Sequence, residues 1–404
     1  MRIVFVNLHT NAALVKTASK YIFKQSVAIK HKYLIDYLIN ETDFEICSYV
    51  NKQGTSIANN LPKLFMTILI SLRFVESSWV LKKNGLFERV KILKDLSDIK
   101  HDDLVILYQL FASKSIDVGK VNAFKVMSLL HFDGTRSNSE DIRICSPQML
   151  FCESNLYKHS DVFQKYYDWC HLDIMVHPFV PEKRFKIIKP FNERKNKVFS
   201  TGTITYKKHQ EFLDVYGDSC DQPIRKYVKD HQEELKGLID CYSSDFSEDA
   251  KAAMEFKMGD SKLIKTIKSG YYKFFGSQQK SYYSFNMVEK FNDYKMCLIG
   301  EEILGVPGIG FVEGMACGCA YIGRRGYYED YGMQEGIHYI GYDGTTDDLK
   351  DTIRYYQMQE HQRELEGIAR NGYLFVKEHF DGNVVAKELI DCFIEKQKAF
   401  LSNQ

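Results

Sequence analysis

A glycine-rich loop that opens into a short apolar helix is the segment of this chain best suited to chemistry. Residues 305–318 read Gly-Val-Pro-Gly-Ile-Gly-Phe-Val-Glu-Gly-Met-Ala-Cys-Gly. We expect Gly308, Ile309 and Gly310 to present free backbone N–H groups at the start of the helix, where those groups and the helix dipole favour a phosphate. Glu313, one turn further on, can accept two hydrogen bonds from the ribose of the same nucleotide. The alternative is a tight turn with a glutamate that only offsets the helix dipole.

The residues that follow carry a family resemblance. Glu313-Gly-Met-Ala-Cys-Gly318 resembles the Glu-Ala-Met-Ala-Cys-Gly signature of nucleotide-sugar glycosyltransferases with the GT-B fold, above all the large retaining family. The similarity continues through 320–329 and 335–340 into the closing helices. One position departs from the pattern. Where the family has a second glutamate, eight positions before Glu313, this chain has Gly305. In the family that glutamate contacts the donor sugar.

The resemblance implies two doubly wound Rossmann-like α/β domains that face a central cleft. It also implies donor contacts near the start of the second domain. The run Ser200-Thr-Gly-Thr-Ile-Thr-Tyr-Lys-Lys208 stands where the family has a glycine turn and then basic residues that reach the phosphates. We therefore expect Gly202, Thr203, Lys207 and Lys208 to bind the donor, although two solvated lysines at a helix start would give the same pattern.

Metal and cofactor are not expected. GT-B enzymes generally stabilise the leaving diphosphate with helix dipoles and basic side chains, and this sequence contains no Asp-x-Asp, the usual metal-binding signature of the other main glycosyltransferase fold. The ten cysteines show no Cys/His spacing suited to zinc. They are best interpreted as small buried hydrophobic residues in a reducing compartment.

Candidate catalytic residues lie in the first half of the chain. His131 and Asp133, in Leu-Leu-His-Phe-Asp-Gly, follow an apolar strand predicted over 125–130. Ligands gather at the carboxyl ends of such strands, and the retaining family has a histidine in a similar context facing the donor sugar. In an inverting enzyme either side chain would be the general base, while a protonated His131 could stabilise the departing phosphate. A purely structural histidine is the alternative.

Composition bounds the class of protein. The chain has 404 residues, of which 45% are hydrophobic and 14% aromatic, so two or three domains with substantial cores are expected. The net charge of +1 gives no overall attraction to nucleic acid, and we expect none as a partner. No stretch reads as a signal peptide or approaches the ~20 apolar residues of a membrane span. The sequence predicts a cytoplasmic protein.

Strands alternate with helices in two series, which indicates parallel sheets. We predict an N-terminal acceptor-side domain over 1–185, a C-terminal nucleotide-sugar-binding domain over 186–382, and a terminal helix over 383–404 that can return to the first domain. The predicted strands cover 2–7, 44–50, 104–108, 125–130, 142–145, 173–176, 197–199, 295–299, 320–323 and 338–341.

Residues 61–94 combine apolar runs, Trp79 and clustered lysines and arginines. That mixture suits the surface of an anionic membrane, and it equally suits two amphipathic helices that pack normally. With the resemblance, it suggests peripheral attachment at the inner face of a bacterial membrane.

The function expected on these grounds is transfer of a hexosyl or related sugar from a nucleotide-activated donor to a glycan or lipid-linked glycan, as in capsule or lipopolysaccharide synthesis. Two alternatives stay open: a GT-B-fold sugar-nucleotide epimerase or hydrolase, and a catalytically degenerate sugar-nucleotide-binding subunit.

Overall fold

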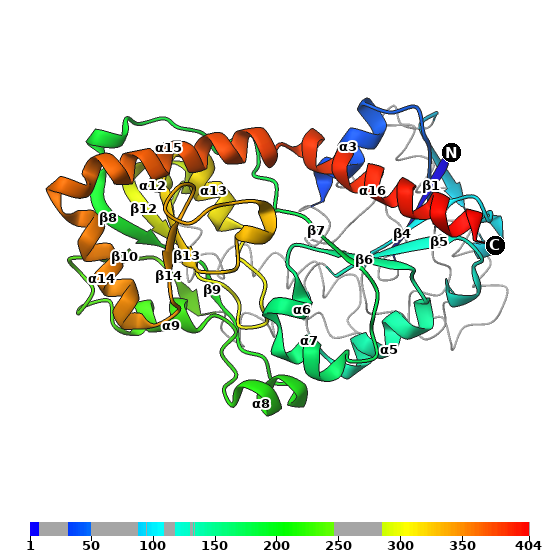
Figure 1. Ribbon diagram of the computed structural model, residues 1–404, viewed down its shortest axis with the longest axis horizontal. Helices are drawn as coiled ribbons and strands as arrows, with labels where there is room; N and C mark the ends of the chain where they lie inside the picture. Colours follow the sequence, from blue (N-terminus) through cyan, green and yellow to red (C-terminus); the bar gives the residue numbers. More distant parts are fainter. Residues whose placement is uncertain are drawn as a thin grey trace, which may run out of the picture. The chain divides into compact units, whose positions relative to one another are not determined.

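The computed structural model describes residues 1–7, 31–49, 88–93, 95–108, 118–129, 132, 134–245 and 285–403. The chain forms two compact units, each with its own parallel sheet (Figure 1). Unit 1 comprises Met1–Val180 and Asp381–Gln404, and unit 2 comprises Pro181–Phe380. The boundaries expected at 185/186 and 382/383 lie five and two residues beyond the observed ones.

Unit 1 is built on a seven-stranded sheet in the order β3-β2-β1-β4-β5-β6-β7, with all neighbours parallel. Its strands are β1 (Arg2–Asn7), β2 (Glu45–Tyr49), β3 (Val90–Leu93), β4 (Leu104–Tyr108), β5 (Phe124–Ser128), β6 (Met149–Cys152) and β7 (Ile174–Val176). The central strands β4 and β5 are buried at every position. Strand β4 is continuously apolar, as expected of a buried parallel strand, whereas β5 also buries the polar residues Lys125 and Ser128.

Helices cover the sheet of unit 1. They are α3 (Lys32–Asn40), α5 (Arg136–Cys145), α6 (Leu156–His159), α7 (Asp161–Tyr166) and the long terminal helix α16 (Gly382–Ser402). In Figure 1, α16 runs beside α3, and the two helices pack together. The buried residues Leu389 and Phe393 of α16 belong to the same apolar core as Phe5 and Ile106 of the sheet. The terminal helix is thus part of unit 1.

One predicted strand is wrong. Residues 142–145 end the helix α5, and the next strand is β6, four residues further on. Thr135 begins this helix, since its hydroxyl oxygen accepts a hydrogen bond from the N–H of Asn138. Ser146, expected at the end of a strand, instead caps the helix C-terminus with φ 48°. The short Ile-Arg-Ile-Cys alternation indicated a strand, yet burial along 136–145 follows the spacing of a helix.

Unit 2 has a five-stranded parallel sheet in the order β10-β8-β12-β13-β14. Its strands are β8 (Lys195–Ser200), β10 (Ile239–Cys241), β12 (Tyr294–Leu298), β13 (Ala320–Arg324) and β14 (Ile340–Tyr342), with a small pair of β9 (Thr203–Ile204) and β11 (Ser244–Asp245). The helices are α8 (Gln210–Tyr216), α9 (Pro223–Asp230), α12 (Met287–Asp293), α13 (Gly310–Ala316), α14 (Thr346–Gln357) and α15 (Gln362–His379).

The described part of residues 61–94 contributes to the fold of unit 1. Arg89 donates hydrogen bonds to the carbonyl oxygens of Leu38, Ile39 and Thr42 at the end of α3. Lys91, on β3, pairs with Glu45 on β2 at 3.0 Å. Of this segment the structure describes residues 88–93, which include β3, and residues 61–87 and 94 lie outside the described part. Among the helices described here, none is both long enough and apolar enough to cross a lipid bilayer.

Helix α13 lies so close to β12 that one position cannot hold a side chain. A Cβ added at Gly314, where the resembled signature has alanine, would lie 2.5 Å from the Sγ of Cys297 and 3.1 Å from the ring of Phe291. Gly318 ends the segment in the left-handed region with φ +77°, as expected for a residue that terminates a helix.

Gly314→Ala should therefore destabilise the protein, even though it restores the family residue and improves helix propensity. Overpacking typically costs ~1–3 kcal/mol, which exceeds the gain of about 1 kcal/mol for replacing glycine in a helix. The matched control is Gly367→Ala in α15, where an added Cβ would meet nothing within 4 Å. Calorimetry should show a lower melting temperature for Gly314→Ala and an unchanged or higher one for Gly367→Ala. Equal melting temperatures would contradict the close packing.

Candidate functional site

The carboxyl edge of the sheet in unit 2 gathers most of the predicted donor-binding residues. Because β8, β10 and β12 are parallel neighbours, the loops that follow them emerge at the same edge. Ser200 ends β8, Thr201 and Gly202 follow it, and Gly300 and Glu301 lie just after β12. Ligands of doubly wound sheets bind at this edge. This edge is therefore the candidate ligand site of unit 2.

Arg225, on α9, ties these loops together. Its Nη1 donates to the carbonyl oxygen of Thr203 at 2.9 Å, its Nη2 to that of Gly300 at 3.1 Å, and its Nε to that of Ile299. The side chain is buried, with a residue exposure of 7%. Among the described residues no carboxylate forms an ion pair with it, so its positive charge is met only by backbone carbonyl groups.

Two of the predicted donor-binding glycines are needed to make room for this arginine. A Cβ on Gly308 would lie 2.4 Å from the Nη2 of Arg225, and a Cβ on Gly202 would lie 2.9 Å from its Nε. Gly300, with φ +70°, also packs against the arginine side chain. The glycine turn after β8 and the loop before α13 thus both pack against the same guanidinium group.

The motif helix α13 is buried along its whole length, and Glu313 in its first turn is 8% exposed. Ile309 precedes the helix and Gly310 begins it, packed against Ile299, where a Cβ would lie 2.9 Å from the isoleucine side chain. Burial raises the pKa of the Cys317 thiol at the end of this helix to about 12, so the thiol stays protonated at neutral pH.

The structure gives a physical reason for the missing family glutamate. Gly305 has φ +88°, a conformation that strains any residue with a Cβ. The neighbouring acidic residue, Glu301, does not fill the gap. Its Oε1 accepts hydrogen bonds from the hydroxyl of Tyr328 at 2.6 Å and from the N–H of Arg324 at 2.9 Å. Burial and the nearby Glu301 charge raise the pKa of Tyr328, which keeps that hydroxyl protonated and donating.

Three buried hydroxyl groups at the same edge have no hydrogen-bond partner among the described residues. They are Ser200 Oγ at the end of β8, Thr201 Oγ1 just after it, and Ser243 Oγ after the neighbouring strand β10. Ser200 is fully buried and Thr201 is 1% exposed. Buried polar groups are normally paired, so hydroxyls of this kind suit a polar ligand. In the sequence, Ser200 and Thr201 carry no signal of their own beside the predicted donor-binding residues Gly202 and Thr203.

The two predicted phosphate-binding lysines differ in their surroundings. Lys207 lies 3.8 Å from the buried carboxylate of Asp221, and its N–H donates to the carbonyl oxygen of Ser219. Lys208 is exposed. Both precede α8, whose N-terminus is capped by the ring of His209. The predicted catalytic residues His131 and Asp133 lie outside the described residues, just beyond β5 in unit 1.

We expect Arg225→Met to destabilise unit 2, because the carbonyl oxygens of Ile299, Gly300 and Thr203 lose their guanidinium donors and the first two of these hydrogen bonds are buried. At ~1–3 kcal/mol for each buried unpaired group, the loss should reach at least about 2 kcal/mol. The control is Lys226→Met on the same helix, which removes only an exposed ion pair with Asp230 and should cost under about 1 kcal/mol. Calorimetry of both variants checks this difference. An Arg225→Met variant as stable as the control would refute the role of the guanidinium.

Neither a protein-family model nor a curated protein matches this sequence. Solved structures do match its fold. A sucrose-phosphate synthase from Thermosynechococcus elongatus aligns with a TM-score of 0.53 and 9% identity over 98% of this chain and 99% of that one. HepE from Anabaena, in complex with UDP and glucose, aligns with a TM-score of 0.52 and 10% identity over 98% and 100%. These likenesses show the GT-B fold of the glycosyltransferases, and the predicted fold class is confirmed.

Proposed function

We propose that the protein is a glycosyltransferase that binds a nucleotide-sugar donor at the carboxyl edge of the unit 2 sheet. The observation that carries the proposal is the convergence there of glycine loops, a buried guanidinium and unpaired hydroxyls. The edge is where doubly wound folds bind nucleotides. HepE, which has the same fold, binds UDP and glucose.

The proposed roles follow from chemistry. Glu313 accepts hydrogen bonds from the ribose, while the backbone N–H groups of Gly308, Ile309 and Gly310 face the diphosphate. Arg225 supports this arrangement, because it holds the loop in place and adds a positive charge that no carboxylate neutralises within the described residues. Lys207 and Lys208 supply further charge, and a phosphate would compete with Asp221 for Lys207. No metal is needed to stabilise the diphosphate in this scheme.

The acceptor is proposed from the sequence. A glycan or lipid-linked glycan of a bacterial surface polysaccharide, met at the cytoplasmic face of the membrane, follows from the sequence resemblance and from the basic segment 61–94. Arg89 and Lys91 already have partners within unit 1. Attraction to an anionic membrane therefore depends on the other basic residues of that segment.

A degenerate sugar-nucleotide-binding subunit is the second candidate, and Gly305 is the observation that favours it. A chain whose backbone excludes the sugar-contacting glutamate could bind a nucleotide without transferring the sugar. Donor-dependent glycosylation of an acceptor separates the two functions. An epimerase or hydrolase would instead consume the donor without an acceptor.

Glu313→Gln should weaken nucleotide binding without unfolding the protein. Loss of a charge-assisted hydrogen bond typically costs ~1.5–3 kcal/mol, which corresponds to roughly ten- to a hundredfold in affinity. Calorimetric titration with nucleoside diphosphates measures the effect. Glu366→Gln, an exposed position on α15, is the matched control and should bind as the wild type does. The ribose role of Glu313 is wrong if both variants bind equally well.

His131→Ala and Asp133→Asn should retain nucleotide binding, and at least one should lose transfer. Removal of a general acid or base typically lowers the rate by ~10²–10⁴. Transfer is measured without added Mg²⁺ or Mn²⁺, since the proposed site uses amides and basic side chains, and nucleotide affinity is measured in parallel. Near-normal turnover in both variants would place the catalytic group elsewhere.

A further inference from the structure

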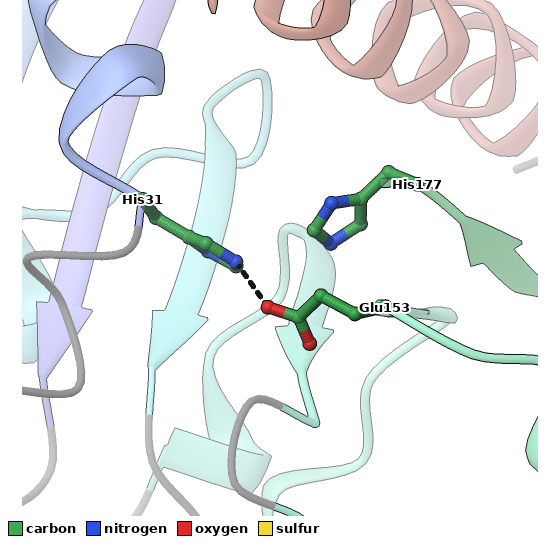
Figure 2. Close-up of side chains that lie close together, drawn as sticks. All are labelled: His31, Glu153 and His177. Carbon is green, nitrogen blue, oxygen red and sulfur yellow. Dashed lines mark hydrogen bonds and ion pairs between the residues drawn. The ribbon is translucent and has the colours of Figure 1, made fainter. Parts of the chain in front are cut away.

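A second group of chemically capable side chains lies in unit 1, whereas the residues assigned to the donor belong to unit 2. His31, Glu153 and His177 come from three separate parts of the chain and point toward one another (Figure 2). His31 immediately precedes α3, Glu153 follows β6, and His177 follows β7. Because Cys152 of β6 pairs with Val176 of β7, the residues after them emerge side by side at the carboxyl edge of the sheet.

The three side chains lie close together and are buried from solvent. One ligand atom from each lies within 4.8 Å of the other two. The Nε2 of His31 is 2.9 Å from Glu153 Oε1. The residues are only 1%, 1% and 2% exposed, in chain order. A buried carboxylate flanked by two imidazoles is costly to desolvate unless it is paired or coordinates a metal.

The contacts of His177 indicate which of its nitrogens can bind a metal ion. Its Nδ1 lies 3.2 Å from the carbonyl oxygen of Pro178, which can only accept, and in the tautomer that makes this hydrogen bond Nδ1 bears the hydrogen. Its Nε2 is then unprotonated in the neutral ring, and it has no hydrogen-bond partner among the described residues. A buried, unprotonated imidazole nitrogen that accepts no hydrogen bond has a lone pair that can coordinate a metal ion.

The outer nitrogens of both rings are held as they are in metal sites. The Nδ1 of His31 is 2.9 Å from the hydroxyl of Tyr108, and the Nδ1 of His177 is within hydrogen-bond distance of Pro178 O and of the Tyr33 hydroxyl. Metal-binding histidines almost always use the second ring nitrogen for such a contact, which fixes the tautomer and the ring orientation.

We propose that His31, Glu153 and His177 bind one Zn²⁺ ion. Two imidazoles and a carboxylate are a known zinc ligand set, whereas Mg²⁺ and Ca²⁺ prefer all-oxygen sites. Tetrahedral zinc with ligands at about 2.1 Å needs ligand atoms about 3.4 Å apart, so small side-chain movements suffice from the present separations of up to 4.8 Å.

Binding requires one proton to move. His31 Nε2–H now donates to Glu153, and it must give up that hydrogen to bind zinc. A tautomer in which Nδ1 bears the hydrogen and donates to the oxygen of Tyr108 keeps the ring neutral and the proton count unchanged. The site would join the start of α3 to the ends of two strands, so the role proposed for the metal is to stabilise unit 1.

The test uses the full-length protein, stripped with a chelator and dialysed against Zn²⁺ or Co²⁺. We expect one tightly bound Zn²⁺ per chain by elemental analysis and a higher melting temperature with zinc than without. The Co²⁺ form should show a tetrahedral spectrum without thiolate charge-transfer bands, which excludes the ten cysteines as ligands. Zinc held through thiolates, or no bound zinc, would overturn the proposal.

Glu153→Gln and His177→Gln should each weaken zinc binding at least about 100-fold, since loss of even an outer-shell partner costs 10–100-fold. His101→Gln, an exposed histidine of the same unit, is the control and should bind zinc normally. Nucleotide binding in unit 2 and circular dichroism check that the variants fold. Unchanged zinc affinity in folded variants would leave only a hydrogen-bonded cluster. If a variant misfolds, the cobalt spectrum of the wild type decides.

Discussion

The candidate donor site depends on one buried guanidinium group. Arg225 is held by the carbonyl oxygens of Ile299, Thr203 and Gly300, which lie on loops that follow two different strands. A lysine could not replace it, because a single ammonium lacks the planar fork that reaches several carbonyls at once. Glycines at 202 and 308 leave the space that the fork occupies. The glycine-rich sequence therefore serves the packing of an arginine as much as the approach of a ligand.

This arrangement changes how the glycine motif should be interpreted. From the sequence, Gly308 and Gly310 were free to approach a phosphate, whereas in the structure their missing side chains are already accounted for by Arg225 and Ile299. Close packing explains the glycines without a ligand, so they cannot by themselves identify a phosphate site. The buried hydroxyls of Ser200 and Thr201 are stronger evidence for a ligand, because the described fold gives them no hydrogen-bond partner.

Much of the fold could be predicted from the sequence, because buried parallel strands are continuous apolar runs. Leu104–Tyr108 and Ala320–Arg324 are examples. The strand predicted over residues 142–145 was wrong, because four residues are too few to distinguish a strand from the last turn of a capped helix. Arg225 gave no signal, because it is one basic residue on a polar helix and its partners are backbone atoms 22 to 75 residues away. The role of Gly305 could be inferred only from its backbone angle, and that of Gly314 only from the distance between an added Cβ and its neighbours, neither of which the sequence contains.

The same limitation hid the histidine cluster of unit 1. Zinc sites are usually found in sequence by short ligand spacings, but His31 and Glu153 are separated by 122 residues and meet only because the fold brings the start of α3 to the end of β6. A zinc ion there would not conflict with a metal-free diphosphate site. Divalent ions that assist diphosphate departure bind oxygens of the substrate and exchange with water, whereas this cluster offers two imidazoles and almost no exposure to solvent. A requirement for added Mg²⁺ and a requirement for retained Zn²⁺ would thus report on different units of the protein.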